Sequence, residues 1–264
     1  MNENGLDYFI EGENFLEVIF LSESNHSFET LLDICENIPK AWFELSKLRK
    51  EDRIDFSCDF VLKTLPYVPK VYPIIFDFFK RLEDIDVVLT KSKNSEIFRS
   101  QIVYSLKDED VFYKGFPPAD FGDIDIINFE FNNMLPKDYL SFAKIHSGFS
   151  KNDDSGLFKI EELKNVYVEF QKILQSLDER PKADNSFIDP NSLIPFYQCY
   201  NKNDFQCFLS DWAPNGSLGN VYYSGADNVV SNYILKKDDS SLMSFNSFLE
   251  WLVFYLDRGD IYDI

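Results

Sequence analysis

Two Asp-x-Asp pairs are the residues whose type and spacing could bind a metal ion. Asp84 and Asp86 lie in the segment EDIDVV, and Asp123 and Asp125 lie in GDIDII. Residues two apart in a β-strand share a face, so either pair could offer carboxylate oxygens to a divalent cation. The competing interpretation makes them the solvent face of an amphipathic strand whose isoleucines and valines point inward. We favour this second interpretation because the whole chain is rich in acid, and we predict no metal site.

His146 could serve as a general base with Asp211 as its partner. A single histidine at a helix end is more often a capping or hydrogen-bonded polar group. Ser147–Gly148 suits a helix stop, because glycine tolerates the left-handed conformation needed there. The chain has no GxxxxGK[ST], GxSxG or HExxH motif and no GxGxxG after a strand. We therefore expect no catalytic residue, no cofactor and no enzymatic activity.

Cysteine and histidine are too dispersed for a structural zinc site. The thiols are Cys35, Cys58, Cys199 and Cys207, and the imidazoles are His26 and His146. No CxxC pair occurs, whereas zinc needs clustered thiolates or imidazoles. Four cysteines among 264 residues also make a sparse disulfide framework. We expect reduced, partly buried thiols.

No segment of the sequence indicates export or membrane insertion. The first residues, MNENGLDYFIEGEN, are acidic and lack the basic start and apolar core of a signal peptide. The densest apolar runs, FLEVIFL and YPIIFDFF, carry charges and fall short of the roughly 18 residues that a membrane span needs. We expect a cytoplasmic protein that does not bind membranes.

The net charge disfavours nucleic acid as a binding partner and favours a basic protein. The chain has 45 acidic and 26 basic residues, a formal charge of −19, of which −12 falls in 1–133 and −7 in 134–264. Both halves repel a phosphate backbone, which argues against direct nucleic-acid binding. A basic protein surface is the complementary partner, because opposite fields steer association. Solubility alone is an equally good explanation of the charge.

Helices are predicted to dominate the first part of the chain. One begins after Ser27, a second begins at Pro39, and apolar positions at helical spacing continue to about Glu83. The pattern then changes to period two and predicts three strands of a small antiparallel sheet, at 85–92, 98–106 and 110–116. The next segment, ADFGDIDIINFEF, has alternating isoleucines and bridges the halves. We place the domains at 1–118 and 119–264.

The second half alternates helices and strands. The pattern predicts helices at 137–146, at 161–177 and after Ser244 as N-cap, and strands at 155–160, 192–201, 204–212 and 221–225. The sequence begins the first helix with Leu-Pro and ends it with Ser-Gly. It closes with GNVYYS and then SFNSFLEWL.

This order of motifs resembles the SUKH superfamily, over roughly residues 121–258. The matching positions are Leu135, Pro136, Tyr139, Phe142, Ser147, Gly148, Asp211, Gly219, Val221, Tyr222, Ser244, Phe245, Phe248 and Leu249. The sequence departs from the family at Ser147–Gly148, where Asn-Gly is usual, and in the long polar segment 175–192. Residues 1–116 resemble no family.

The resemblance implies an α+β domain with an antiparallel sheet flanked by helices. We therefore expect an α+β protein, in which a mainly helical module with a small antiparallel sheet precedes the SUKH-like domain. The superfamily contains fungal glucan-synthesis regulators and bacterial immunity proteins that neutralise secreted toxins, commonly nucleases. The resemblance therefore implies binding and carries over no catalytic residue.

Aromatic side chains crowd the predicted strands of this domain, at Phe196, Tyr197, Tyr200, Phe205, Phe208, Trp212, Tyr222 and Tyr223. Half of them should form the core, and the other half an exposed face of the kind enriched at protein interfaces; a core role for all of them is the more common outcome. Asp211, Trp212, Tyr222 and Tyr223 are the predicted partner-binding residues.

The favoured hypothesis is a non-enzymatic immunity protein that covers a basic surface of a partner such as a nuclease. The alternative is an intracellular regulatory or scaffold protein without a toxin partner, and a metal-assisted hydrolase using the Asp-x-Asp pairs is a third. The gene next to this one discriminates the first two, because a toxin gene favours immunity.

Overall fold

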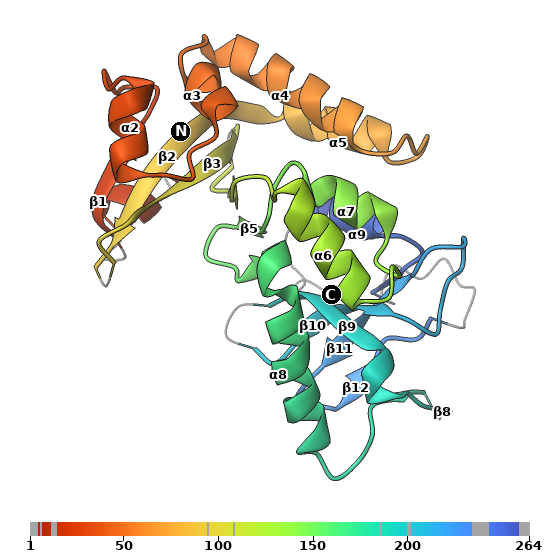
Figure 1. The fold of residues 1–264 in the computed structure, drawn as a ribbon. Coiled ribbons are helices and arrows are strands. Elements are labelled where there is room, and N and C mark those ends of the chain that lie inside the picture. Colours follow the sequence, from red (N-terminus) through yellow and green to blue (C-terminus); the bar gives the residue numbers. More distant parts are fainter. Residues whose placement is uncertain are drawn as a thin grey trace. The chain divides into compact units, whose positions relative to one another are not determined.

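The protein is α+β and divides into two compact units (Figure 1). The computed structural model describes residues 5, 7–11, 15–93, 95–107, 109–184, 186–199, 202–233 and 243–258. The first unit comprises Met1–Pro118 and Ile145–Asp153, and the second comprises Ala119–Lys144 and Asp154–Ile264. Residues 145–153 therefore belong with the first unit, although we placed them in the second domain.

The first unit contains an antiparallel sheet with its strands in chain order. They are β1 (Phe15–Phe20), β2 (Leu82–Ser92), β3 (Phe98–Leu106), β4 (Phe112–Gly115) and β5 (Phe149–Lys151). The three predicted strands are β2, β3 and β4, and their antiparallel pairing is confirmed. β1 pairs with β2 and β5 pairs with β4, and β5 reaches β4 from more than thirty residues away in the chain.

Four helices pack on this sheet, and two of them contact the strand β2. They are α2 (Phe28–Ile34), α3 (Lys40–Ser46), α4 (Lys50–Thr64) and α5 (Tyr72–Lys80), of which α3 and α4 contact β2 and α5 contacts α4. Ser27 begins α2, as predicted, because its Oγ accepts a hydrogen bond from the Thr30 N–H at 3.3 Å. A short π-helical turn, η1 (Asp7–Glu11), adds Phe9 to a cluster with Val88, Val103 and Phe112.

The second unit also contains a sheet, in which β7 pairs parallel to β12 and the other pairs are antiparallel. Its order is β6 (Gly156–Leu157), β9 (Leu193–Gln198), β10 (Phe205–Leu209), β11 (Asn220–Ser224), β12 (Val229–Val230), β7 (Lys182–Ala183) and β8 (Ser186–Phe187), and β13 (Ser244–Phe245) also pairs with β11. The predicted strands around β6, β9, β10 and β11 are confirmed.

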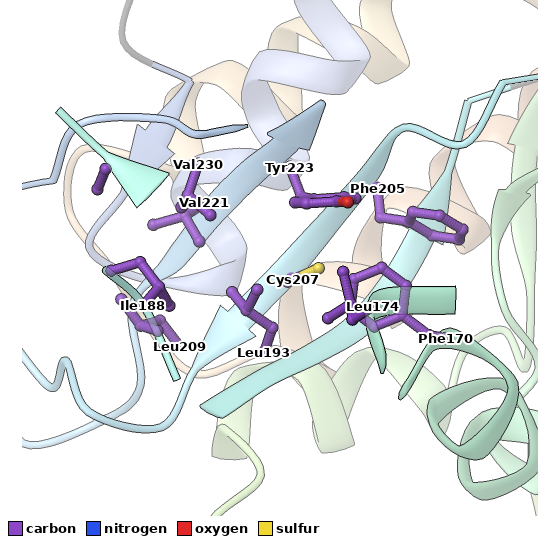
Figure 2. Packing of buried hydrophobic residues seen from close by; sticks show 11 residues of the cluster. Phe170, Leu174, Ile188, Leu193, Phe205, Cys207, Leu209, Val221, Tyr223 and Val230 are labelled. Atoms are coloured by element: carbon purple, nitrogen blue, oxygen red, sulfur yellow. The ribbon is translucent and has the colours of Figure 1, made fainter. Parts of the chain in front are cut away.

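Both faces of this second sheet are covered by helices. On one face, Phe170 and Leu174 of α8 (Leu163–Gln175) pack on a cluster that includes Phe205, Cys207 and Tyr223 (Figure 2). On the other face, α7 (Lys137–Ala143) and α9 (Phe248–Arg258) supply the aromatic rings of Tyr139, Phe248, Trp251 and Tyr255, which contact Phe196, Tyr197 and Phe208. The sheet is therefore an interior layer.

Three local predictions need correction. The segment with alternating isoleucines is a helix, α6 (Phe121–Glu130), which buries Ile124 and Ile127. The helix α7 ends at Ala143 and not at Ser147–Gly148; Gly148 has a φ of 91° and turns the chain into β5. Ser244 lies in β13, and Ser247 is the residue that caps α9, because its Oγ accepts the Glu250 N–H at 3.2 Å.

Two short connections, η2 (Ile160–Glu162) and η3 (Pro190–Ser192), are 3₁₀ turns.

No helix in the described ranges is long and apolar enough to cross a membrane.

Candidate partner-binding surface

The predicted binding residues Asp211 and Trp212 begin the loop between β10 and β11. The loop is closed by backbone hydrogen bonds from Trp212 N–H to the Leu209 carbonyl at 3.0 Å and from Gly219 N–H to the Trp212 carbonyl at 2.9 Å. Residues 211–216, which we call the 211–216 loop, are exposed, apart from the half-buried Trp212. The loop therefore presents a carboxylate and an indole next to each other on a fixed turn.

Trp212 holds this loop against the core of the second unit. A Cβ atom on Gly219 would lie 2.4 Å from the Trp212 ring, so the absence of a side chain at Gly219 makes room for the indole. The same ring packs against the cluster beneath α8 and lies 5.3 Å from the ring of Tyr233. Because one side of the indole is packed and the rest is open, Trp212 can contact a partner without losing its own position.

The other two predicted binding residues, Tyr222 and Tyr223, are not part of the surface that Asp211 and Trp212 form. Tyr222 is half-buried, whereas Tyr223 is 1% exposed and lies in the cluster beneath α8, where its hydroxyl donates to Asn228 Oδ1 at 3.1 Å. Neighbouring residues on a strand point to opposite faces. Tyr223 is consequently a core residue and cannot touch a partner, while Tyr222 points away from the face on which Trp212 packs.

The structure adds two residues, Asn232 and Tyr233, that no local sequence pattern indicated. The ring of Tyr233 lies tilted beside that of Trp212, and the preceding Asn232 donates a side-chain hydrogen bond to the exposed carboxylate of Asp184. Asp184 adopts a φ of 50°, which places it in the turn between β7 and β8. Because Tyr233 follows the β11–β12 hairpin by sequence, its approach to Trp212 depends on the folded sheet.

The expected exposed aromatic face is absent from the strands that the structure describes. Phe196, Tyr197, Phe205 and Phe208 are all buried, because helices cover both faces of the sheet. Tyr200 lies outside the described residues. The aromatic part of the candidate surface is therefore limited to Trp212 and Tyr233.

His146 is buried and engaged at both ring nitrogens. Its Nδ1 lies 3.1 Å from the Phe116 carbonyl and its Nε2 lies 2.7 Å from the Tyr104 hydroxyl. A carbonyl can only accept, so Nδ1 carries the proton and Nε2 accepts from Tyr104. Burial lowers the pKa of His146 to about 4. His146 belongs to the first unit and Asp211 to the second, and the imidazole is a hydrogen-bonded packing element, as the second sequence interpretation held.

Neither Asp-x-Asp pair forms the solvent face of a strand. Asp84 and Asp86 are buried in β2, where Asp84 Oδ1 accepts from Arg53 Nη2 at 2.7 Å and Asp86 Oδ2 accepts from the Ser22 hydroxyl at 2.5 Å. Burial is the main cause that raises the pKa of Asp86. Asp123 and Asp125 lie on α6, where residues two apart diverge by about 200°. No group of three potential metal ligands occurs among the described residues.

The four cysteines are free and buried, which agrees with the expected reduced thiols. Burial raises the pKa of Cys58 to about 11 and that of Cys199 to about 12. A thiol that stays protonated is a poor nucleophile. These residues therefore serve packing.

A hollow of about 440 Å³ lies in the first unit beside β1. Its lining contains the strand residues Val18, Ile19 and Phe20 and the turn residues from Glu23 to His26. Glu23 and His26 are the ionisable groups of this lining, and the Ser24 hydroxyl between them accepts a hydrogen bond from the His26 backbone N–H at 3.1 Å.

The chemistry of the candidate surface favours recognition of a cation. An exposed carboxylate at Asp211 can pair with a lysine or an arginine, and the open side of an indole attracts the same groups through cation–π contact. Tryptophan is also enriched among the residues that contribute most to protein interfaces.

Comparison with known proteins identifies the second unit. The model of the SMI1/KNR4 family (SUKH-1) matches residues 118–253. None of the curated proteins matches the chain. The matched range covers the elements from α6 into α9, including the candidate surface, and spans half of the sequence. The chain therefore belongs to the SMI1/KNR4 family (SUKH-1).

Proposed function

We propose that this chain is a non-enzymatic binding protein that acts as an immunity protein, neutralising a nuclease-type toxin by covering a basic surface on it. SUKH-type domains typically bind protein partners, and the family includes regulatory and immunity-type proteins. The observation that carries the proposal is the pairing of Asp211 with a half-buried Trp212 on a hydrogen-bonded loop of the family domain.

The charge of the chain supports a basic partner. A formal charge of −19 raises the rate of encounter with a positively charged protein and disfavours acidic competitors. The cell carrying the protein would be protected because occlusion of a basic nucleic-acid site prevents the nuclease from binding its substrate. The protein needs no catalytic group for this action.

The test compares two double variants in cells that express the protein encoded by the neighbouring gene. Asp211→Lys with Trp212→Ala reverses the charge and removes the indole, and we expect it to abolish both co-purification and protection of growth. The matched control is Asp55→Lys with Phe56→Ala, an adjacent exposed acid and aromatic on α4. It makes the same change in net charge, and we expect it to protect as the unchanged protein does.

Full protection by the Asp211→Lys, Trp212→Ala protein would contradict the proposed surface. A neighbouring protein that is harmless and binds normally would instead favour a regulatory or scaffold role for the same domain.

A further inference from the structure

α6 exposes apolar side chains that the second unit leaves uncovered. Ile126 is 61% exposed and Phe129 is 73% exposed, while Ile124 and Ile127 on the opposite side of the helix are buried. A surface helix of a globular protein ordinarily has one apolar face and one polar face. α6 is apolar on both, which is typical of a helix that is covered on both sides.

The exposed residues form one continuous face. Gly122, Asp125, Ile126 and Phe129 are separated by three or four positions, so they are neighbours along the same side of the helix. We call these four residues the α6 face. A Cβ atom on Gly122 would meet no other atom within 4 Å, so the space above this end of the face is open. Glycine at such a point allows a second backbone to approach closely.

The charged residues of α6 and its N-cap are all negative, while Lys144 and Lys164 lie over Phe121 and Phe131 at the two ends of the helix. Asp120, Asp123, Asp125 and Glu130 are exposed, and α6 itself contains no basic residue. Within the described part of the chain none of these carboxylates has a hydrogen bond or an ion pair. Asp120 and Asp123 stabilise the helix because they lie at its positive N-terminal end. Asp125 lies in mid-helix and Glu130 lies at the negative C-terminal end, so helix stability does not explain them.

A second exposed apolar face, on α4, shows the contrast. Phe56 and Phe60 are 56% and 44% exposed there. Two of the acids on this segment are already neutralised, because Asp52 pairs with Arg49 at 2.9 Å and Asp59 pairs with Lys63 at 3.1 Å. α4 contains the basic residues Lys50, Arg53 and Lys63, whereas α6 contains no basic residue that could neutralise its carboxylates.

We propose that the α6 face is a docking site for an amphipathic helix of another protein that carries lysine or arginine beside its apolar stripe. The apolar stripe would cover Ile126 and Phe129, and the cations would pair with Asp125 and Glu130. A second copy of this chain is disfavoured because it would bring carboxylate to carboxylate. An anionic membrane is disfavoured for the same reason, since interfacial helices carry basic residues on their polar face. The site is separate from the 211–216 loop and does not rest on it.

The test uses fluorescence anisotropy of the full chain with a labelled amphipathic peptide of leucine and lysine. Two comparison peptides separate the contributions: one has glutamate in place of every lysine, and one has serine in place of every leucine. We expect the leucine–lysine peptide to bind, the glutamate peptide not to bind, and the serine peptide to bind at least about tenfold more weakly.

The variants locate the site. Ile126→Ser with Phe129→Ser should weaken peptide binding by about tenfold or more, because the complex loses the two apolar side chains that the peptide would cover. Phe56→Ser with Phe60→Ser is the matched control on α4 and should bind as the unchanged protein does. Asp125→Asn with Glu130→Gln should weaken binding several-fold and flatten its dependence on salt, whereas Asp178→Asn with Asp227→Asn, at exposed acids outside α6, should not. Circular dichroism of each variant confirms that the fold is retained.

Three results would overturn the proposal. Equal weakening by the α4 and α6 variants would show a general attraction to an acidic protein. Equal binding of the serine and leucine peptides would show that the apolar face takes no part. Sedimentation showing a dimer that Ile126→Ser and Phe129→Ser disrupt would assign the face to a second copy. Binding of the Asp211→Lys, Trp212→Ala protein to the peptide should be unchanged, which keeps the failure of this site distinct from failure of the 211–216 loop.

Discussion

A buried histidine can be fully satisfied while neutral, and His146 is such a residue. The Phe116 carbonyl fixes the proton on Nδ1, and the Tyr104 hydroxyl donates to Nε2. The ring also stacks on Phe149 at a centroid distance of 5.5 Å and lies against Gly115, where a Cβ would come within 2.4 Å. Protonation would add a charge to this packed site, so the neutral form is the one that the fold accommodates.

This environment predicts a pH-dependent stability. In the unfolded chain a histidine has a pKa near 6.5, whereas the folded pKa of His146 is about 4. The unfolded state therefore takes up a proton first as the pH falls, and the free energy of unfolding decreases below pH 6.5. Between pH 7.5 and pH 5, which remains above the sequence pI of 4.4, we expect a loss of about 2 kcal/mol from this residue, measured by urea unfolding at each pH.

Carboxylates titrate in part of the same pH range, so the share of the stability loss that His146 causes is measured by comparing variants. His146→Gln should lose about 2 kcal/mol less than the unchanged protein over that interval. His26→Gln, at an exposed histidine, should retain the full loss. An identical pH slope in the His146→Gln protein would show that the imidazole does not titrate with folding.

At the scale of elements, a buried ion pair between Arg53 and Asp84 connects α4 to β2, beside the more exposed pair of Lys50 with Glu83. The Arg53 and Asp84 side chains are 8% and 12% exposed, and Asp84 Oδ1 also accepts the Ile85 N–H at 2.7 Å. Bringing two charges out of water is costly, so such a pair adds little net stability, yet loss of one partner leaves a buried charge without compensation.

We predict strong coupling between these two residues. Arg53→Met should lower the free energy of unfolding by about 3–5 kcal/mol, because the Asp84 carboxylate stays buried after it has lost the charge of Arg53. Arg53→Met with Asp84→Leu should recover most of that loss, as measured in a double-mutant cycle by denaturant unfolding. Losses that simply add would mean that the two charges do not depend on each other. Lys40→Met, at the exposed i,i+4 pair with Glu44, should change stability by less than about 1 kcal/mol.

Local patterns predicted the elements whose sequence period was unambiguous. The period-two segments became β2, β3 and β4, and Ser27 capped α2 as expected. α6 was missed because Ile124 and Ile126 alternate as in a strand, although Ile124 and Ile127 are the pair that the helix buries. β5 was missed because its pairing with β4 joins residues far apart in the sequence.

The candidate surface could be predicted only as far as its residues are neighbours in the chain. Asp211 and Trp212 are adjacent in the chain, so one turn is enough to present both. Tyr222 and Tyr223 could not both be exposed on one strand, and the alternation rule alone already excluded one of them. Tyr233 meets Trp212 through the folded sheet, which no local pattern encodes.

At the scale of the whole molecule, the two units are not consecutive lengths of chain. The first unit includes residues 145–153, which supply β5, His146 and Phe149. Phe149 stacks on Tyr113 at a centroid distance of 5.6 Å and His146 bonds to Tyr104, so these residues complete the interior of the first sheet. The sequence boundary at 118 separates them from it.

A fragment of residues 1–118 should therefore be unstable. It lacks β5 and two buried rings, so the Tyr104 hydroxyl loses its hydrogen bond to His146 and the Tyr113 ring loses its stacking on Phe149. We expect the fragment to show no cooperative thermal transition by circular dichroism, whereas the full chain unfolds cooperatively. A fragment of residues 1–153 contains every segment of the first unit and is the matched control, which should regain a transition. Cooperative unfolding of 1–118 alone would show that β5 is dispensable.

The inserted strand also has a consequence for the order in which the chain folds during synthesis. Domains generally fold as units as they leave the ribosome, the N-terminal one first. Here the first sheet cannot receive its last strand until residues 145–153 have been made, and by then α6 and α7 of the second unit have also been made. Some apolar side chains of the first sheet therefore stay uncovered while α6, with its exposed Ile126 and Phe129, is already present. Translation speed between residues 118 and 153 thus becomes a determinant of yield, and slow codons placed there would prolong the period in which the growing chain is open to aggregation.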